Sequence, residues 1–126
     1  MTLIFGGAYQ GKLDYVLERF VLTDGDVYRC DEQNTVMPAN RKVLYEIDKW
    51  ILALTKENID AEDAVRQLIN NNPNAIVICN DISCGIVSVD PVMRKWREAV
   101  GRSMAELSRC SDEVVRVFCG IPTRLK

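Results

Sequence analysis

A glycine-rich segment near the N-terminus has the spacing of a phosphate-binding loop. Residues 6–12 read Gly-Gly-Ala-Tyr-Gln-Gly-Lys and fit the pattern G-x-x-x-x-G-K. Glycines let backbone N–H groups converge on phosphate oxygens, and the lysine brings a positive charge to the β- and γ-phosphates. The segment follows an apolar run and precedes a helical pattern, which is the context that this motif requires. We predict a nucleotide site whose residues are Gly6, Gly7, Ala8, Tyr9, Gln10, Gly11, Lys12 and Leu13.

The motif departs from its usual form at the last of these positions. A Ser or Thr normally follows the lysine and binds Mg²⁺ through its hydroxyl, whereas this chain has Leu13, which cannot coordinate a metal. Two interpretations stay open at this point. One is a nucleotide site with weakened or relocated metal binding, and the other is an ordinary glycine-rich turn with Lys12 on the surface. Tyr9 either lies over a nucleotide base or caps the surface, and we favour the surface.

The chain contains no histidine, which excludes several kinds of chemistry. A Ser-His-Asp triad, a Cys-His pair, a histidine metal ligand and a phosphohistidine intermediate are all impossible. The cysteines are odd in number and none has C-x-x-C spacing, so we expect neither a zinc site nor a secreted disulfide framework. We predict reduced and mostly buried thiols, with Cys79 and Cys119 inside apolar runs. The others are Cys30, Cys84 and Cys110.

Length and charge point to one soluble, cytoplasmic domain that spans residues 1–126. The chain has a net charge of −2, which argues against a nucleic-acid surface spread over the whole protein. No apolar run approaches the roughly 20 residues of a membrane helix, and the N-terminus lacks the basic region of a signal peptide. Residues 1–93 carry 8 basic and 14 acidic side chains, whereas residues 94–126 carry 8 basic and 4 acidic ones. The basic end either faces an anionic ligand through residues such as Arg94, Lys95, Arg97 and Arg102, or forms a solvated helix face.

Apolar periodicity predicts alternating strands and helices around these residues. Asp60 and Asp90 are expected helix N-caps, with Pro91 in the first helical position. Trp50 and Trp96 lie on apolar helical stripes and are predicted to be core residues. Such an alternation is typical of an α/β domain with a mainly parallel sheet. The predicted strands are 2–5, 27–30, 75–79 and 114–119, the predicted helices are 13–20, 41–56, 60–69 and 90–107, and 31–40 is a predicted loop.

Several segments resemble, in order, the adenosylcobinamide kinase / adenosylcobinamide-phosphate guanylyltransferase family of cobalamin biosynthesis. The likeness covers residues 2–20 and 75–126 and is poor in the middle, where this chain is shorter than the family. The segments that carry it are the glycine loop, Ile76–Asp81, Gly85–Val87, Trp96–Arg102, Asp112–Val115 and Cys119–Pro122.

The resemblance implies a P-loop-type three-layer fold that forms homo-oligomers, with GTP or ATP bound on the glycine loop. It also implies phosphorylation of adenosylcobinamide, followed by transfer of GMP from GTP onto the product. Gly6, Gly7, Gly11 and Lys12 carry over as phosphate-binding residues. Asp81 matches the acidic residue after a family strand, which would bind the metal or the second ligand. Gly101 and Arg102 match signature positions to which we assign no role.

This chain also departs from the family. Guanylyl transfer there proceeds through a guanylylated histidine, and no histidine is present here. The family's acidic residue after its third strand would correspond to Glu46, or alternatively to Asp48, although the periodicity predicts that stretch to be helical. We therefore predict Lys12 and Asp81 as catalytic residues, and Asp81 and Glu46 as ligands of a weakened or relocated Mg²⁺ site. The alternative is a non-enzymatic, nucleotide-responsive or oligomeric partner protein with the same fold.

Overall fold

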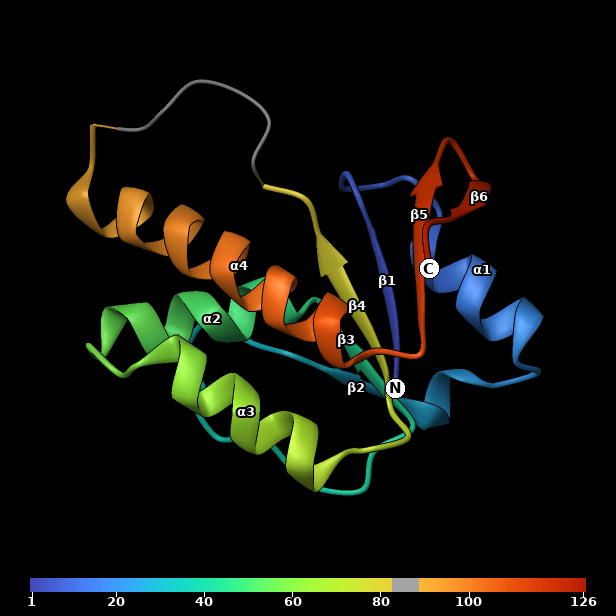
Figure 1. The fold of residues 1–126 in the computed structure, drawn as a ribbon, viewed down its shortest axis with the longest axis horizontal. Coiled ribbons are helices and arrows are strands. Elements are labelled where there is room, and N and C mark those ends of the chain that lie inside the picture. The colour runs from blue at the N-terminus through green and yellow to red at the C-terminus, as the bar shows by residue number, and fades with distance from the viewer. Residues whose placement is uncertain (83–88) are drawn as a thin grey trace.

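A six-stranded sheet forms the centre of the molecule, with helices on both of its faces (Figure 1). The structure is a computed structural model and describes residues 1–82 and 89–126. The strand order is β2-β3-β4-β1-β5-β6. The strands are β1 (Thr2–Gly6), β2 (Val27–Arg29), β3 (Val43–Tyr45), β4 (Ile76–Asn80), β5 (Glu113–Phe118) and β6 (Ile121–Arg124). The helices are α1 (Lys12–Arg19), α2 (Ile47–Lys56), α3 (Ala61–Asn71) and α4 (Pro91–Cys110), and a 3₁₀ turn covers Asp24–Asp26.

The sheet is mainly parallel, as the alternation of strands and helices predicts. Strands β1 to β5 pair in parallel, and only β6 runs antiparallel, as the second strand of a hairpin with β5. The central strand β1 lies between β4 and β5, and its last residue, Gly6, is level with Asn80 at the end of β4. The carboxyl ends of β1, β3 and β4 therefore open onto the same edge of the sheet, where ligands of such folds usually bind.

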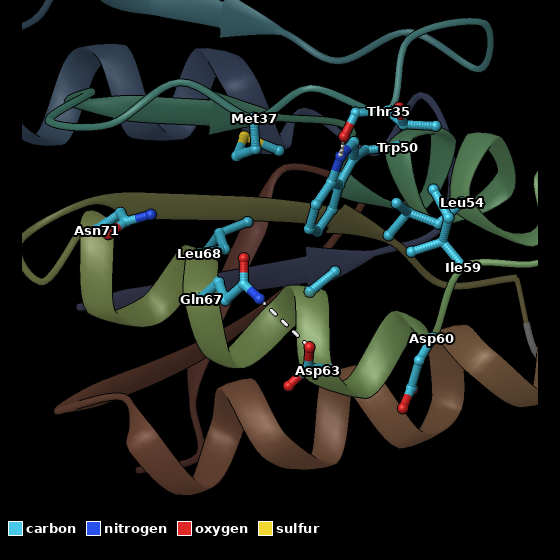
Figure 2. A pocket seen from close by; sticks show the side chains of 11 residues that line it. Thr35, Met37, Trp50, Leu54, Ile59, Asp60, Asp63, Gln67, Leu68 and Asn71 are labelled. Carbon is cyan, nitrogen blue, oxygen red and sulfur yellow. Dashed lines mark hydrogen bonds between the residues drawn. The ribbon is translucent and has the colours of Figure 1, made fainter.

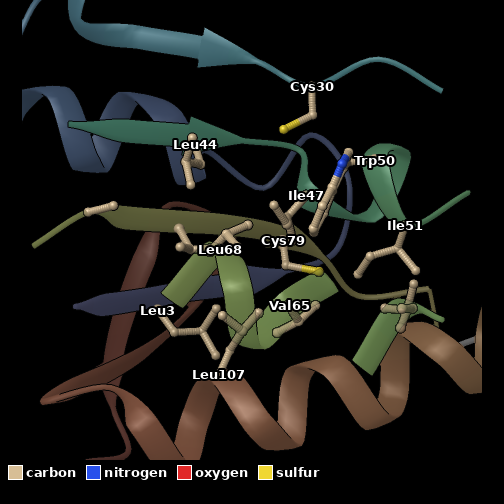
Figure 3. Close-up of a cluster of buried hydrophobic side chains, with 14 of the residues drawn as sticks. Leu3, Cys30, Leu44, Ile47, Trp50, Ile51, Val65, Leu68, Cys79 and Leu107 are labelled. Carbon is tan, nitrogen blue, oxygen red and sulfur yellow. The ribbon is translucent and has the colours of Figure 1, made fainter. Parts of the chain in front are cut away.

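Side chains that alternate along the strands build two cores, one on each face of the sheet. Leu3, Leu44 and Val77 pack against α2, α3 and α4, and Figure 3 shows part of this larger cluster. Their neighbours Ile4 and Val43 face the other way, toward Val16 of α1. The result is a three-layer α/β fold, which confirms the predicted fold class. No helix within 1–82 or 89–126 is long and apolar enough to cross a membrane.

Residues 41–56 are not the single helix that their periodicity predicts. Val43–Tyr45 form β3, Glu46 adopts a left-handed conformation with φ 60°, and α2 begins at Ile47. Val43 and Leu44 are consecutive, and both are fully buried because they face opposite cores. A buried strand followed at once by an amphipathic helix thus produces one continuous apolar pattern, which conceals the boundary.

The C-terminal part also departs from expectation. Strand β5 ends at Phe118, and a turn with positive φ at Cys119 (51°) and Gly120 (75°) leads into β6, which the sequence does not predict. Cys119 is exposed rather than buried, as is Cys110, whereas Cys30 and Cys79 are buried. Trp50 is buried as predicted, and Trp96 is only partly buried. Cys84 and Gly85–Val87 lie outside the described residues.

Local signals for helix starts are confirmed. Asp60 accepts a hydrogen bond from the backbone N–H of Glu62 at 3.0 Å and caps α3. Asp90 likewise accepts from the N–H of Val92 at 2.9 Å, with Pro91 in the first turn of α4. These caps need only neighbouring residues, which is why the sequence alone predicts them.

Candidate functional site

The glycine loop and the ends of β3 and β4 enclose a cavity of about 640 Å³. The loop leaves the carboxyl end of β1 and enters α1, so the N-terminus of this helix borders the same space. The cavity therefore lies where the motif places a phosphate group, in front of backbone N–H groups and the positive end of a helix. The residues that line it are Ala8, Tyr9, Gln10, Gly11, Lys12, Leu13, Asp14, Tyr45, Glu46, Lys49 and Asn80.

The shape of the loop depends on its contact with the β5–β6 turn. The side chain of Gln10 accepts a hydrogen bond from the N–H of Cys119 at 2.6 Å, and its carbonyl accepts one from the N–H of Gly120 at 2.9 Å. At the start of the loop, a Cβ on Gly6 would lie 2.3 Å from the carbonyl oxygen of Val117. Only glycine fits at this position, so the loop sits directly against the backbone of β5.

Lys12 is a buried residue of the cavity, which overturns the interpretation of it as a surface side chain. It is 4% exposed, and its ammonium donates a hydrogen bond to the carbonyl oxygen of Gly7 at 2.6 Å. Burial lowers the pKa of Lys12, and the negative charges of Asp48 and Glu46 partly oppose this shift. A buried ammonium with a single described hydrogen bond has unused donors for an anionic ligand.

Two carboxylates at the start of α2 surround the side chain of Asn80. Nδ2 of Asn80 donates to Oε2 of Glu46 at 3.2 Å and to Oδ2 of Asp48 at 3.3 Å. Glu46 also pairs with Lys49 at 3.1 Å. Asp48 is 3% exposed, and burial raises the pKa of its carboxyl group while its hydrogen bonds to Asn80 oppose the shift. The site thus combines a cationic loop with an anionic opposite wall.

The predicted acidic ligands occupy different places. Glu46 lines the cavity, directly after β3, so its position after a strand agrees with the resemblance rather than with the predicted helix. Asp81 directly follows β4, and its backbone N–H donates to the carbonyl of Gly6 at 2.7 Å, but it is not among the described residues that line the cavity. The exposed Asp14 does line it.

The oxygen groups that line the cavity fit a magnesium ion that arrives with a nucleotide. Mg²⁺ prefers oxygen ligands and is usually held by one or two carboxylates together with phosphates and water. Glu46 and Asp14 supply such carboxylates, whereas Leu13 supplies no ligand. No group of three His, Cys, Asp or Glu side chains within the described ranges could hold a metal by itself. The donor set therefore suits a metal that is bound jointly with phosphates.

Sequence reasoning missed four residues of the cavity wall. Asp14 follows Leu13 and Asn80 precedes Asp81, and both of these neighbours are predicted site residues. Their adjacency in the sequence is a signal that could have identified Asp14 and Asn80. Tyr45 and Lys49 reach the cavity only because β3 ends at Tyr45, a boundary that the apolar pattern conceals.

The basic C-terminal residues do not add to this cavity where the structure describes their contacts. Arg102 pairs with Glu98 and lies 3.6 Å from Glu62, so acidic neighbours balance its charge. Ala105, Glu106 and Arg109 line a separate hollow with it, between α3 and α4.

A further pocket of about 280 Å³ lies between α2, α3 and the segment before β3 (Figure 2). In it, Nε1 of Trp50 donates to the carbonyl of Thr35 at 2.9 Å, and Gln67 donates to Asp63 at 3.3 Å. This pocket shares no lining residue with the loop cavity.

Comparison with protein families gives a match to the model described as cobinamide kinase / cobinamide phosphate guanyltransferase, over residues 34–125. Comparison with curated proteins gives no match. The matched range includes the middle of the chain, where the sequence resemblance was expected to be poor. It contains Glu46, Asp48 and Asn80, whereas the glycine loop precedes it.

Proposed function

The chain belongs to the cobinamide kinase / cobinamide phosphate guanyltransferase family, and from this premise we propose that its loop cavity binds the phosphates of GTP or ATP. The observation that carries this proposal is the buried Lys12, whose ammonium lies at the head of α1 beside a cavity of about 640 Å³. Backbone N–H groups of residues 7–12 and the positive end of α1 would hold the phosphates. We therefore expect Mg²⁺ and a nucleotide as ligands, and we expect the carboxylate of Glu46 to contribute to binding of the metal.

We propose that the reaction is transfer of the γ-phosphoryl group to the hydroxyl of adenosylcobinamide. Phosphoryl transfer requires mainly positioning and neutralisation of charge, since the transferred group carries its charge on oxygens. Lys12 would neutralise part of this charge, and a bound Mg²⁺ would supply further neutralisation between the phosphates. Asp81 stays a predicted catalytic residue on the strength of the resemblance, because it follows β4 beside Gly6.

We also propose that this chain does not perform histidine-dependent guanylyl transfer. The sequence contains no histidine, so the guanylylated histidine of the family has no counterpart. Incubation with GTP should leave the intact mass of the protein unchanged. An increase by the mass of GMP in mass spectrometry would contradict this proposal.

A non-enzymatic role is the second candidate, and Leu13 is the observation that favours it. Without the usual hydroxyl, the loop would hold nucleotide yet fail to orient the metal for turnover. The protein would then be a nucleotide-responsive partner that acts through binding alone. In either role we expect a cytoplasmic homo-oligomer.

Calorimetry with GTP and with ATP, each with and without Mg²⁺, tests the binding proposal. We expect binding by the wild type, loss of binding in Lys12→Ala, and wild-type binding in Lys42→Ala, a lysine that pairs with Asp26 outside the cavity. Absence of binding at millimolar nucleotide would refute the proposed site.

Turnover separates the two candidate roles. Protein, GTP, adenosylcobinamide and Mg²⁺ are incubated together, and chromatography detects the phosphorylated product. Product that disappears in Lys12→Ala would establish the kinase, whereas nucleotide binding without product would establish the non-enzymatic role.

A further inference from the structure

Asp48 is a buried carboxylate that accepts two hydrogen bonds from the last residue of β4. Its Oδ1 accepts a hydrogen bond from the backbone N–H of Asn80 at 3.1 Å, and its Oδ2 accepts one from Nδ2 of the same residue at 3.3 Å. Nδ2 also donates to Oε2 of Glu46 at 3.2 Å. Asp48 itself does not line the loop cavity, whereas Asn80 and Glu46 do.

These contacts fix which way the amide of Asn80 points. An ionised carboxylate only accepts hydrogen bonds, so the amide nitrogen must face Asp48 and Glu46. The amide oxygen Oδ1 must then point away from both carboxylates. Asn80 borders the cavity, and no hydrogen bond between described residues uses its Oδ1. The amide oxygen is therefore an acceptor that is held in place and that the described residues leave unused.

We propose that Asp48 is a positioning residue that holds the Asn80 amide so that Oδ1, beside Glu46, acts as an oxygen ligand for the divalent cation of a bound nucleotide. This inference rests on the proposed nucleotide site. Leu13 offers no oxygen to such a cation, and an amide oxygen is a ligand of the type that hard cations prefer. The cation would then sit on the wall formed by β3, β4 and α2 rather than on α1.

The burial of Asp48 supports a positioning role over a stabilising one. The residue is only 3% exposed, and its two oxygens accept hydrogen bonds from the backbone N–H and the side-chain amide of Asn80 at 3.1 and 3.3 Å. Removing a charge from water costs free energy, and here the charge serves to fix the amide of Asn80. Loss of a group that orients a metal ligand lowers metal affinity about 10–100-fold.

The variant Asp48→Asn separates the two roles. It keeps the size of the side chain and removes the charge, but its own amide can no longer accept both hydrogen bonds from Asn80. We expect Mn²⁺ to bind about 10–100-fold more weakly in the presence of guanosine 5′-(β,γ-imido)triphosphate. Affinity for this nucleotide without metal should stay unchanged, and the melting temperature should not fall. Asp63→Asn, in a pocket that shares no residue with the cavity, is the matched control.

A double-variant cycle shows whether Asp48 acts through Asn80. Asn80→Ala removes Oδ1 and should weaken Mn²⁺ binding at least as much as Asp48→Asn does. The double variant should bind Mn²⁺ no more weakly than Asn80→Ala alone. Additive losses, or wild-type Mn²⁺ affinity in Asp48→Asn, would overturn the proposal.

A measurement without nucleotide keeps this inference distinct from the proposed function. Without phosphates Mn²⁺ should bind more weakly, but a large excess of Mn²⁺ alone should still broaden the side-chain amide signals of Asn80 in NMR spectra of the wild type, and less so in Asp48→Asn. If calorimetry finds no nucleotide binding but this difference is present, the proposed function fails and the positioning role stands. If Mn²⁺ broadens these signals equally in both proteins, or in neither, the positioning role fails.

Discussion

Adding one methyl group at Gly6 tests how tightly β5 holds the glycine loop. A Cβ at this residue would lie 2.3 Å from the carbonyl oxygen of Val117, whereas ordinary contacts of a Cβ begin at 3.4 Å. The obstacle is a backbone atom of a neighbouring strand, which cannot rotate away as a side chain would. Gly6→Ala must therefore move the start of the loop, or β5, by about 1 Å. A displacement of this size destabilises a tightly packed interior.

The size of the effect follows from this displacement. Overpacking in a tightly packed interior costs about 1–3 kcal/mol of the free energy of unfolding. For a chain of this length, the melting temperature should fall by roughly 4 °C for each kcal/mol. Misplacing a site by about 1 Å can cost up to about 100-fold in function, so we expect nucleotide affinity to fall by tenfold or more.

Gly101→Ala is the matched control. Gly101 lies within α4, and a Cβ there would meet no atom within 4 Å. The substitution should raise the free energy of unfolding by about 0.5–1 kcal/mol, since alanine favours helices over glycine. Urea unfolding followed by circular dichroism, and calorimetry with GTP, compare both variants with the wild type. Wild-type stability and wild-type affinity in Gly6→Ala would refute the close contact between the loop and β5.

Three further predictions follow from single side chains. Leu13→Ser restores a hydroxyl after Lys12, so Mg²⁺·GTP should bind more tightly in calorimetry, while metal-free GTP should bind as before. Unchanged or weaker binding of Mg²⁺·GTP would contradict our view of the metal site. Burial lowers the pKa of Lys12 below its usual 10.5, so the ammonium loses its charge as pH rises through this lowered value. As pH is raised, the nucleotide affinity of the wild type should therefore begin to decrease before pH 10.5 is reached. An affinity that begins to fall only above pH 10.5 would count against this prediction. Cys119 is exposed and should react with a thiol reagent in the folded protein. Burial raises the pKa of Cys30 to about 12, so this thiol should stay unlabelled until the protein unfolds. Mass spectrometry of the labelled peptides measures both reactions.

The parts of the fold that the sequence predicts are those specified by near neighbours. The glycine loop, the caps at Asp60 and Asp90, and the buried strand before Asn80 each depend on residues within a few positions of one another. Alternation of strands and helices then suffices for the three-layer class, because parallel strands need a crossover between them. These features required no knowledge of what lies across the sheet.

The parts that the sequence does not predict depend on long-range contacts. The glycine loop packs against the β5–β6 turn, more than one hundred residues away along the chain, through pairs such as Gln10 and Cys119. The contact between Asp48 and Asn80 likewise joins residues that are 32 positions apart. Strand β6 is exposed along its whole length, so it lacks the apolar alternation that marks a strand.

The family match and the cavity geometry together explain how this chain would form the proposed nucleotide site. The matched range, 34–125, does not include the glycine loop, yet it contains the cavity residues opposite the loop and the β5–β6 turn. Glu46 and Asn80 form the opposite wall, and the β5–β6 turn holds Gln10 through two backbone N–H groups. These contacts, together with that of Gly6 with β5, would therefore hold the loop in place despite Tyr-Gln in its middle and Leu13 at its end. Because these contacts hold the loop, a change at Leu13 should alter metal use without abolishing nucleotide binding. Gly6→Ala disturbs the contact with β5 and should therefore lower nucleotide affinity itself.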